Sequence, residues 1–241
     1  MRASSEGPGS SMQHHEIHRI GSDDELRPAL LHVPPTPEGD SGPRPIAVML
    51  HGSGAGPEQG LNLLEPWASQ SGVLVLAPAS ASSTWDTVLG EQGADTERIE
   101  GALDWVRARF RLDPERVVIG GFSDGASCAL GLGLARADLF SRIVALSPGF
   151  VPRTVPTGAP PVFISHGTHD TVLPITRCSR IIAPRLRAAG CEVSLREFDG
   201  GHVVPADVAR QATAWLLRPL ERSARRARGQ SGHADSRETA L

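Results

Sequence analysis

Residues 117–125 read Val-Val-Ile-Gly-Gly-Phe-Ser-Asp-Gly, a short apolar run followed by a serine between two glycines. The β-branched run predicts a buried strand, and the Ala/Leu/Gly-rich sequence that follows predicts a helix. A sharp turn from strand to helix strains the residue at its tip, Ser123, and needs small neighbours such as Gly121 and Gly125. The pattern therefore indicates a serine hydroxyl above a sheet, at the positive end of a helix. The alternative is an ordinary tight turn with an uninvolved serine.

Short runs dense in Val, Ile and Leu alternate with longer amphipathic segments on both sides of this turn. The alternation predicts an α/β fold in which helices cover both faces of a mostly parallel central sheet. We expect strands at residues 46–51, 73–77, 117–120, 143–146, 162–166 and 192–198, and helices at 59–70, 96–110, 124–136, 175–189 and 206–217. A hairpin of residues 16–20 and 26–33, around a turn at 21–24, is expected at the sheet edge.

The length of 241 residues suits one α/β domain, which we expect to occupy residues 16–222. The polar residues 1–15 and the Arg/Ser/Gly/Ala-rich residues 223–241 are expected to be disordered extensions. No apolar run approaches the roughly 20 residues that cross a bilayer. Because no secretory signal opens the chain either, we expect a cytoplasmic protein without membrane insertion.

Charge and cysteine usage argue against several kinds of partner. The net charge is −3 and the basic residues are scattered, which argues against nucleic-acid binding. Cys128, Cys178 and Cys191 are odd in number and lack the paired spacing of a zinc site. We therefore expect no disulfide framework, no metal and no cofactor. The sequence leaves the oligomeric state open, a homodimer included.

A serine hydroxyl becomes a nucleophile when a base removes its proton and a third group orients that base. The strand expected at 162–166 is followed by Gly-Thr-His-Asp, so Asp170 lies just beyond a strand's carboxyl end, where open α/β sheets carry their sites. The loop Asp-Gly-Gly-His at 199–202 follows the last expected strand, and His202 is the only histidine between Asp170 and the charged tail. We predict Ser123 as nucleophile, His202 as general base and Asp170 as the orienting carboxylate.

Other residues compete for these roles. An aspartate at position 170 also suits a helix N-cap. His166 and His169 flank Asp170, but the order Ser, Asp, His along the chain places the base after the last strand, so both are expected to be structural. Asp124 and Asp199 are rival carboxylates. Each is adjacent in sequence to another predicted catalytic segment, which hinders contact with the far side of the imidazole.

Leu-His-Gly-Ser-Gly at residues 50–54, at the end of the first central strand, is a candidate oxyanion loop. Acyl transfer needs backbone N–H groups that stabilise the negative oxygen of the tetrahedral intermediate. We predict the N–H groups of Ser53 and of Asp124 as these donors. The alternative is a glycine-rich turn, with phosphate binding as one version of it, but the P-loop lysine and the full dinucleotide pattern are absent.

Three separated motifs, LHGSG, GGFSDGAS and SHGTHDTVLP followed by GGH, together resemble the phospholipase/carboxylesterase group of α/β-hydrolases. The likeness covers residues 45–217. It implies an α/β-hydrolase fold and cleavage of small-molecule carboxylic esters or thioesters through an acyl-serine, with the triad and amide donors named above. Dienelactone-hydrolase-like enzymes are also similar, but usually carry cysteine where this chain has Ser123. Asp124 stands where members commonly have glutamine, which leaves the substrate open.

The connection between the strands expected at 143–146 and 162–166 is short and rich in Pro and Gly. It cannot form a large lid domain, so we expect an open site. Phe150, Val172 and Trp85 are candidates for the walls of a substrate pocket. Packing in the core or in loops is an equally good interpretation of the two aromatic residues.

Two other functions are compatible with the same residues. A hydrolase-fold binding protein would keep the cleft without effective chemistry, because a fold does not determine function. The intact set of Ser, Asp and His counts against this reading. An acyltransferase would form the same acyl-enzyme and pass the acyl group to an acceptor other than water.

Overall fold

An eight-stranded sheet forms the centre of the computed structural model, which describes residues 16–21, 28–35, 42–90 and 93–220. The strand order is β1-β2-β4-β3-β5-β6-β7-β8. The strands are β1 (Glu16–Ile20), β2 (Ala29–Val33), β3 (Arg44–Leu50), β4 (Leu74–Ala77), β5 (Leu112–Phe122), β6 (Arg142–Leu146), β7 (Val162–Gly167) and β8 (Val193–Phe198). Strands β3 to β8 pair in parallel, whereas β2 pairs antiparallel with β1 and β4. The mostly parallel sheet and its edge hairpin are therefore confirmed.

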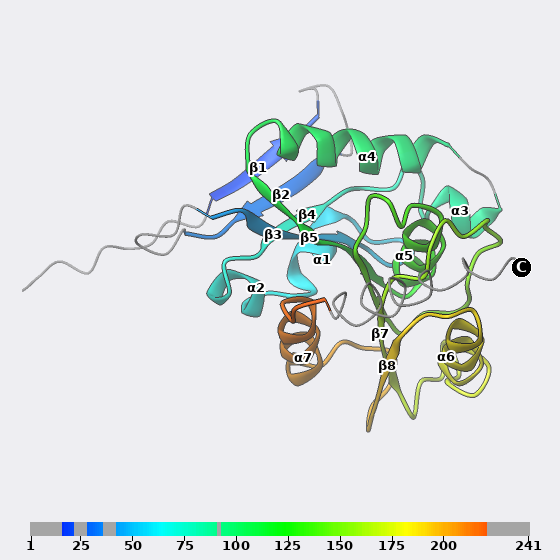
Figure 1. The fold of residues 1–241 in the computed structure, drawn as a ribbon. Coiled ribbons are helices and arrows are strands. Elements are labelled where there is room, and N and C mark those ends of the chain that lie inside the picture. Colours follow the sequence, from blue (N-terminus) through cyan, green and yellow to red (C-terminus); the bar gives the residue numbers. More distant parts are fainter. Residues whose placement is uncertain (1–15, 22–27, 36–41, 91–92, 221–241) are drawn as a thin grey trace, which may run out of the picture.

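Helices cover both faces of this sheet (Figure 1). They are α1 (Pro57–Asn62), α2 (Trp67–Gln70), α3 (Asp86–Leu89), α4 (Ala94–Arg107), α5 (Asp124–Ala135), α6 (Ser179–Ala188) and α7 (Ala206–Leu216). Alternate residues of β3 enter two separate cores, because successive side chains of a strand point to opposite faces. Val48 and Leu50 pack with α4, α5 and α6, and Ala47 and Met49 pack with α1, α2 and α7. The three-layer α/β architecture is confirmed.

Several boundaries differ from the sequence prediction. The single helix expected at 59–70 is wrong, because the chain forms α1 and α2 with Pro66 between them. Proline has no N–H to donate to a helix and restricts the residue before it. The helix expected from residue 175 begins only at Ser179, and α3 was not predicted. Residues 22–24 of the expected turn and the extensions 1–15 and 223–241 lie outside the described residues.

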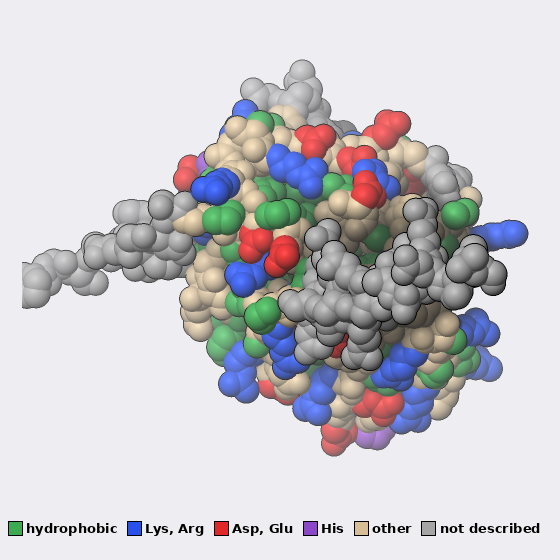
Figure 2. Space-filling view, in the orientation of Figure 1, with side chains coloured by type: hydrophobic (Ala, Val, Ile, Leu, Met, Phe, Trp, Pro, Cys, Tyr) green, Lys and Arg blue, Asp and Glu red, His purple; other side chains and the backbone are tan. Residues whose placement is uncertain are grey.

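Residues 147–161, between β6 and β7, contain no helix or strand. The expectation that the fold has no large lid domain is therefore confirmed. Charged side chains of both signs are interspersed over the face of the molecule drawn in Figure 2. Among the described helices, none has the length and apolar character that a membrane span requires.

The carboxyl ends of β3, β5, β7 and β8 meet at one edge of the sheet, which brings together loops from distant parts of the sequence.

Candidate active site

Ser123 occupies the tight turn between β5 and α5. Its backbone has φ 57° and ψ −119°, a conformation that residues with a side chain rarely adopt. The turn is crowded, since a Cβ added to Gly121 would lie 2.5 Å from the Gly125 carbonyl carbon, and one added to Gly125 would lie 2.3 Å from the Leu50 carbonyl oxygen. The Ser123 N–H donates to the Leu146 carbonyl at 3.0 Å. The two glycines thus allow the strained turn, as their positions in the motif predict.

The structure brings Ser123, His202 and Asp170 together in one chain of hydrogen bonds. His202 Nε2 lies 2.9 Å from Ser123 Oγ, and His202 Nδ1 lies 2.6 Å from Asp170 Oδ2. An ionised carboxylate only accepts hydrogen bonds, so the proton of the neutral ring is on Nδ1 and Nε2 accepts from the serine. The Phe122 ring packs against the His202 ring, with centroids 4.6 Å apart. This arrangement can move a proton from the hydroxyl to the imidazole.

Asp170 is buried, and both of its oxygens are occupied. The N–H groups of Val172 and Leu173 donate to Oδ1 at 2.9 and 2.8 Å. His202 Nδ1 and His166 Nε2 lie 2.6 and 3.2 Å from Oδ2. Burial would raise the pKa of Asp170, but the Leu173 N–H and the His202 ring outweigh burial and hold that pKa below its usual value. The carboxylate is therefore ionised where it meets His202.

His166 is the group that the sequence prediction underrated. Its ring is fully buried, with Nε2 2.7 Å from the Leu173 carbonyl and Nδ1 2.7 Å from Ser179 Oγ. A carbonyl only accepts, so Nε2 carries the proton and Nδ1 accepts from the serine hydroxyl. Burial lowers the pKa of His166 and favours this neutral form. His166 is structural, as expected, but it also directs its N–H toward Asp170, a contact that no periodicity in the sequence indicates.

The two N–H groups predicted to form an oxyanion hole are available. Neither the Ser53 N–H nor the Asp124 N–H has a hydrogen-bond acceptor within the described residues. Asp124 is the first residue of α5, where N–H groups have no partner in the helix. On either side of Ser53, the Gly52 N–H donates to Gln59 Oε1 and the Gly54 N–H donates to a backbone carbonyl, both at 2.7 Å. These bonds fix the loop and leave the Ser53 N–H free.

Trp85 lies behind this loop. It is fully buried, and its Nε1–H donates to the His51 carbonyl at 2.8 Å. The His51 ring lies 4.8 Å from the indole, with Nδ1 2.8 Å from the Gly52 carbonyl and Nε2 3.1 Å from the Ser80 N–H. Of the two interpretations of Trp85, core packing fits its position, and it supports the loop from inside.

The other two pocket candidates remain on the surface. Phe150 follows β6 and Val172 follows Asp170, and both are exposed large apolar side chains. The Val172 N–H is bound to Asp170, which places this residue beside the triad. Both lie on the β6–β7 side of Ser123. Their contact with a substrate stays a prediction.

The rival residues have other partners. His169 Nδ1 and Asp199 Oδ1 are 2.9 Å apart, with side chains 74% and 91% exposed. Asp124 Oδ2 accepts the hydroxyl proton of Thr84 at 2.7 Å. Within the described part of the chain, neither Asp124 nor Asp199 forms a hydrogen bond with His202. Asp170 is the carboxylate that meets the imidazole.

The cysteines are not members of this hydrogen-bonded chain. All three are free and buried, and burial raises the pKa of the Cys128 thiol to about 12. No set of three or more His, Cys, Asp and Glu side chains in the described ranges could hold a metal ion.

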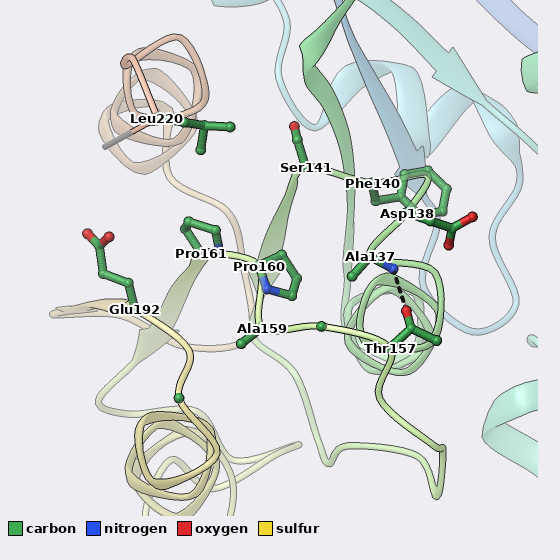
Figure 3. A pocket seen from close by; sticks show the side chains of 12 residues that line it. Ala137, Asp138, Phe140, Ser141, Thr157, Ala159, Pro160, Pro161, Glu192 and Leu220 are labelled. Atoms are coloured by element: carbon green, nitrogen blue, oxygen red, sulfur yellow. Dashed lines mark hydrogen bonds between the residues drawn. The ribbon is translucent and has the colours of Figure 1, made fainter. Parts of the chain in front are cut away.

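A pocket of about 470 Å³ lies elsewhere, at the amino ends of β6 and β7 (Figure 3). Phe140, Thr157 and Pro160 are among its lining residues, and the Ala137 N–H donates to Thr157 Oγ1 at 3.1 Å. The length of the strands separates this pocket from Ser123, because the turn after β5 is at the opposite edge of the sheet. The pocket is not part of the candidate active site.

Two curated relatives are similar to part of this chain. The putative esterase NocK of Nocardia uniformis subsp. tsuyamanensis is 28% identical over 156 residues, which cover 59% of this chain and 43% of the relative. Acyl-protein thioesterase 1 of Gibberella zeae is 31% identical over 117 residues, which cover 44% of this chain and 49% of the relative. The chain thus spans about half the length of the curated relatives it matches.

Solved structures share the architecture at low sequence identity. FphF, a fluorophosphonate-binding serine hydrolase of Staphylococcus aureus, has a TM-score of 0.67 at 14% identity, covering 86% of this chain and 99% of its own. The carboxylesterase of Bacillus cereus has a TM-score of 0.58 at 20% identity, covering 86% of this chain and 94% of its own. These likenesses show a common α/β-hydrolase fold.

The phospholipase/carboxylesterase family model matches residues 95–216, just over half of the chain. The matched region contains the serine turn, the Asp170 loop and the His202 loop, so it includes the complete hydrogen-bonded chain described above. With its α/β-hydrolase fold, the protein therefore belongs to the phospholipase/carboxylesterase family of serine hydrolases.

Proposed function

We propose that the protein hydrolyses small-molecule carboxylic esters or thioesters through an acyl-Ser123 intermediate. The observation that carries this proposal is the unbroken hydrogen-bonded chain from Ser123 through His202 to Asp170, with distances of 2.9 and 2.6 Å. Membership of the family supports it, as do relatives whose names describe an esterase and an acyl-protein thioesterase.

In the first half of the reaction, Ser123 Oγ attacks the substrate carbonyl carbon and His202 Nε2 takes the hydroxyl proton. The carbonyl π electrons move to oxygen, and the N–H groups of Ser53 and Asp124 stabilise that oxyanion. When the carbonyl re-forms, the bond to the leaving oxygen or sulfur breaks. His202 gives its proton to that atom, and an alcohol or thiol departs.

In the second half, water attacks the acyl-Ser123 carbonyl while His202 takes one of its protons. The new tetrahedral intermediate then expels Ser123 Oγ, which recovers a proton from His202, and the acid leaves. Asp170 stays ionised throughout and stabilises the imidazolium form of His202, because it accepts the Nδ1–H. The depressed pKa of Asp170 suits this role.

The experiment combines fluorophosphonate labelling, with the labelled residue mapped by mass spectrometry, and hydrolysis of p-nitrophenyl acetate. Ser123→Ala should remove the label and lower kcat by about 10⁴-fold or more. Ser194→Ala on β8 is the matched control and should keep both the label on Ser123 and the wild-type kcat. Circular dichroism and thermal melting establish that each variant is folded.

A folded wild-type protein that takes no label and hydrolyses no ester would contradict the proposal and favour the binding-protein function. Product analysis with added alcohol addresses the acyltransferase alternative. If a new ester forms in preference to free acid at low alcohol concentration, the protein is an acyltransferase and not a hydrolase.

A further inference from the structure

A groove of about 410 Å³ runs from the candidate active site toward the layer formed by α1, α2 and α7. Its apolar walls include Leu63, Phe122, Val203 and Val204, and His202 itself is one of the lining residues. Val203 directly follows His202 in sequence and is 53% exposed, in contrast to the buried valines of the sheet. The groove is therefore an apolar surface that begins at the triad.

The position of His202 in the wall defines which part of an ester would occupy the groove. His202 must lie within hydrogen-bond reach of the leaving atom to protonate it, so the group attached to that atom lies beside the imidazole. Two further exposed apolar side chains, Phe150 and Val172, belong to the loops after β6 and β7, and the Val172 N–H donates to Asp170. The site thus has two apolar flanks, and His202 belongs to the groove flank.

Of the polar side chains that line the groove, Gln59 and Glu65 already have partners, and Asn62 is exposed. Gln59 Oε1 accepts the Gly52 N–H, and the Glu65 carboxylate accepts the Ser69 hydroxyl at 2.8 Å and lies 2.9 Å from His32 Nδ1. These bonds engage the two strongest acceptors in internal structure. The remaining wall is mostly aliphatic and aromatic, which favours an uncharged hydrocarbon chain over a charged or sugar-like group.

We propose that this groove binds the leaving group, and that the preferred substrates are esters or thioesters of an aliphatic alcohol or thiol. The proposal rests on the proposed function, since it assigns a place to the R–OH or R–SH that departs when the acyl-serine forms. In that step the carbonyl carbon–oxygen or carbon–sulfur bond breaks and the His202 proton goes to the departing atom. Each methylene that enters the groove contributes apolar burial to transition-state binding.

The test compares two series of esters in a pH-stat. Acetates of methanol through hexanol vary only the leaving group, and ethyl esters from acetate to octanoate vary only the acyl group. We expect kcat/KM to rise about two- to fourfold for each methylene of the alcohol until the groove is full. The ratio of kcat/KM for hexyl acetate to that for methyl acetate is the readout within each variant.

Val203→Asp places a charge in the wall, and Ala206→Trp fills the groove from the start of α7 without adding charge. Each variant should lower the hexyl-to-methyl ratio about tenfold or more and leave the slope of the acyl series as in wild type. Val155→Asp is the matched control. Val155 is 83% exposed and lies in the loop after β6, outside the groove, so this variant should change neither series.

Two failures are distinguishable. If methyl acetate is not hydrolysed in a Ser123-dependent way, the proposed function itself is contradicted. The second failure is that methyl acetate is hydrolysed but kcat/KM does not rise along the alcohol series, or that the groove variants alter the acyl series instead. In either case the proposed esterase function is retained and the leaving-group assignment is overturned.

Discussion

The dipeptide His-Gly occurs at the carboxyl ends of two strands, β3 and β7, and the two histidines have opposite hydrogen-bonding roles. His51 is protonated on Nδ1, which donates to the Gly52 carbonyl, and its Nε2 accepts the Ser80 N–H. His166 is protonated on Nε2, which faces a carbonyl and Asp170, and its Nδ1 accepts a hydroxyl. Both rings are fully buried, so neither is a candidate base.

Similar local sequences at the ends of β3 and β7 thus support different halves of one site. The two ring nitrogens of His51 bond to the Gly52 carbonyl and the Ser80 N–H, and these bonds shape the Ser53 loop. His166 reaches a charged side chain and so stabilises the ionised carboxylate as well as its loop. Substitutions on the β3 side should therefore change transition-state stabilisation, and those on the β7 side should change proton handling.

The largest expected effect is on the β7 side, where Asp170→Asn should lower kcat for p-nitrophenyl acetate about 10⁴-fold. The carboxamide would keep an oxygen for the Val172 and Leu173 N–H groups, so its NH₂ group would face both His202 and His166. Because donor would then meet donor, His202 would adopt the other tautomer, with a proton directed at Ser123. Urea denaturation should establish that the variant is folded.

Asp199→Asn is the matched control for this variant. Its carboxylate is exposed and pairs with exposed His169, so kcat should stay within about twofold of wild type. A loss of less than tenfold in Asp170→Asn would show that Asp170 does not orient the base.

The parts of the fold that follow local rules could be predicted from the sequence. The strand–turn–helix around Ser123 depends on glycines whose absent side chains leave room for Leu50 and for each other, and this need is visible in the motif. Asp170 follows β7, whose apolar run is equally visible, and His202 follows β8, where Val193 and Leu195 alternate with polar residues. Parallel pairing then brings the strand ends to one edge, which makes the three residues neighbours.

The parts that depend on tertiary packing could not be predicted. Nothing in the sequence around Trp85 distinguishes a pocket wall from a core residue, and its burial follows from how α3 packs beside the Ser53 loop. The turn at residues 168–173 directs the His166 ring toward Asp170. Outside a helix, a spacing of four residues does not indicate that two side chains are in contact. The groove joins α1 and α7, which lie about 150 residues apart and meet only in the folded molecule.

A smaller effect is expected on the β3 side, where His51→Asn should lower kcat about 10- to 100-fold with KM nearly unchanged. The shorter side chain leaves the buried Ser80 N–H without its acceptor and loosens the loop that presents the Ser53 N–H. Loss of one oxyanion donor costs about 10²- to 10³-fold, which is the upper limit for a loop that is only loosened. The free energy of unfolding should fall by about 1–3 kcal/mol.

The readout that distinguishes this variant is the pH profile. Because both ring nitrogens of His51 bond to the backbone of Gly52 and Ser80, kcat should fall by the same factor from pH 6 to pH 9. A pH-dependent loss, or a rise in KM with kcat retained, would contradict the assignment of His51 to the oxyanion side.

The smallest effect is expected for His166→Gln, which should lower kcat about tenfold at most and change how stability depends on pH. Burial lowers the pKa of His166 in the folded protein below the value of about 6.5 expected when unfolded. As pH falls through 6.5, the unfolded chain therefore binds a proton that the folded chain resists, and wild-type stability is lost. Glutamine cannot titrate, so this part of the loss disappears.

Urea denaturation at pH 7.5 and pH 5.5 tests this expectation as a difference between variants. His166→Gln should be about 1–3 kcal/mol less stable than wild type at pH 7.5, because Leu173 and Ser179 lose a well-placed partner, and the gap should narrow at pH 5.5. His169→Gln is the matched control, because its exposed ion pair with Asp199 should contribute less than about 1 kcal/mol at either pH. An equal gap for His166→Gln at both pH values would mean that the buried ring binds its proton as easily as an exposed one. That result would contradict the electrostatic role given to His166, which is to stabilise the ionised carboxylate of Asp170 as a neutral, buried ring.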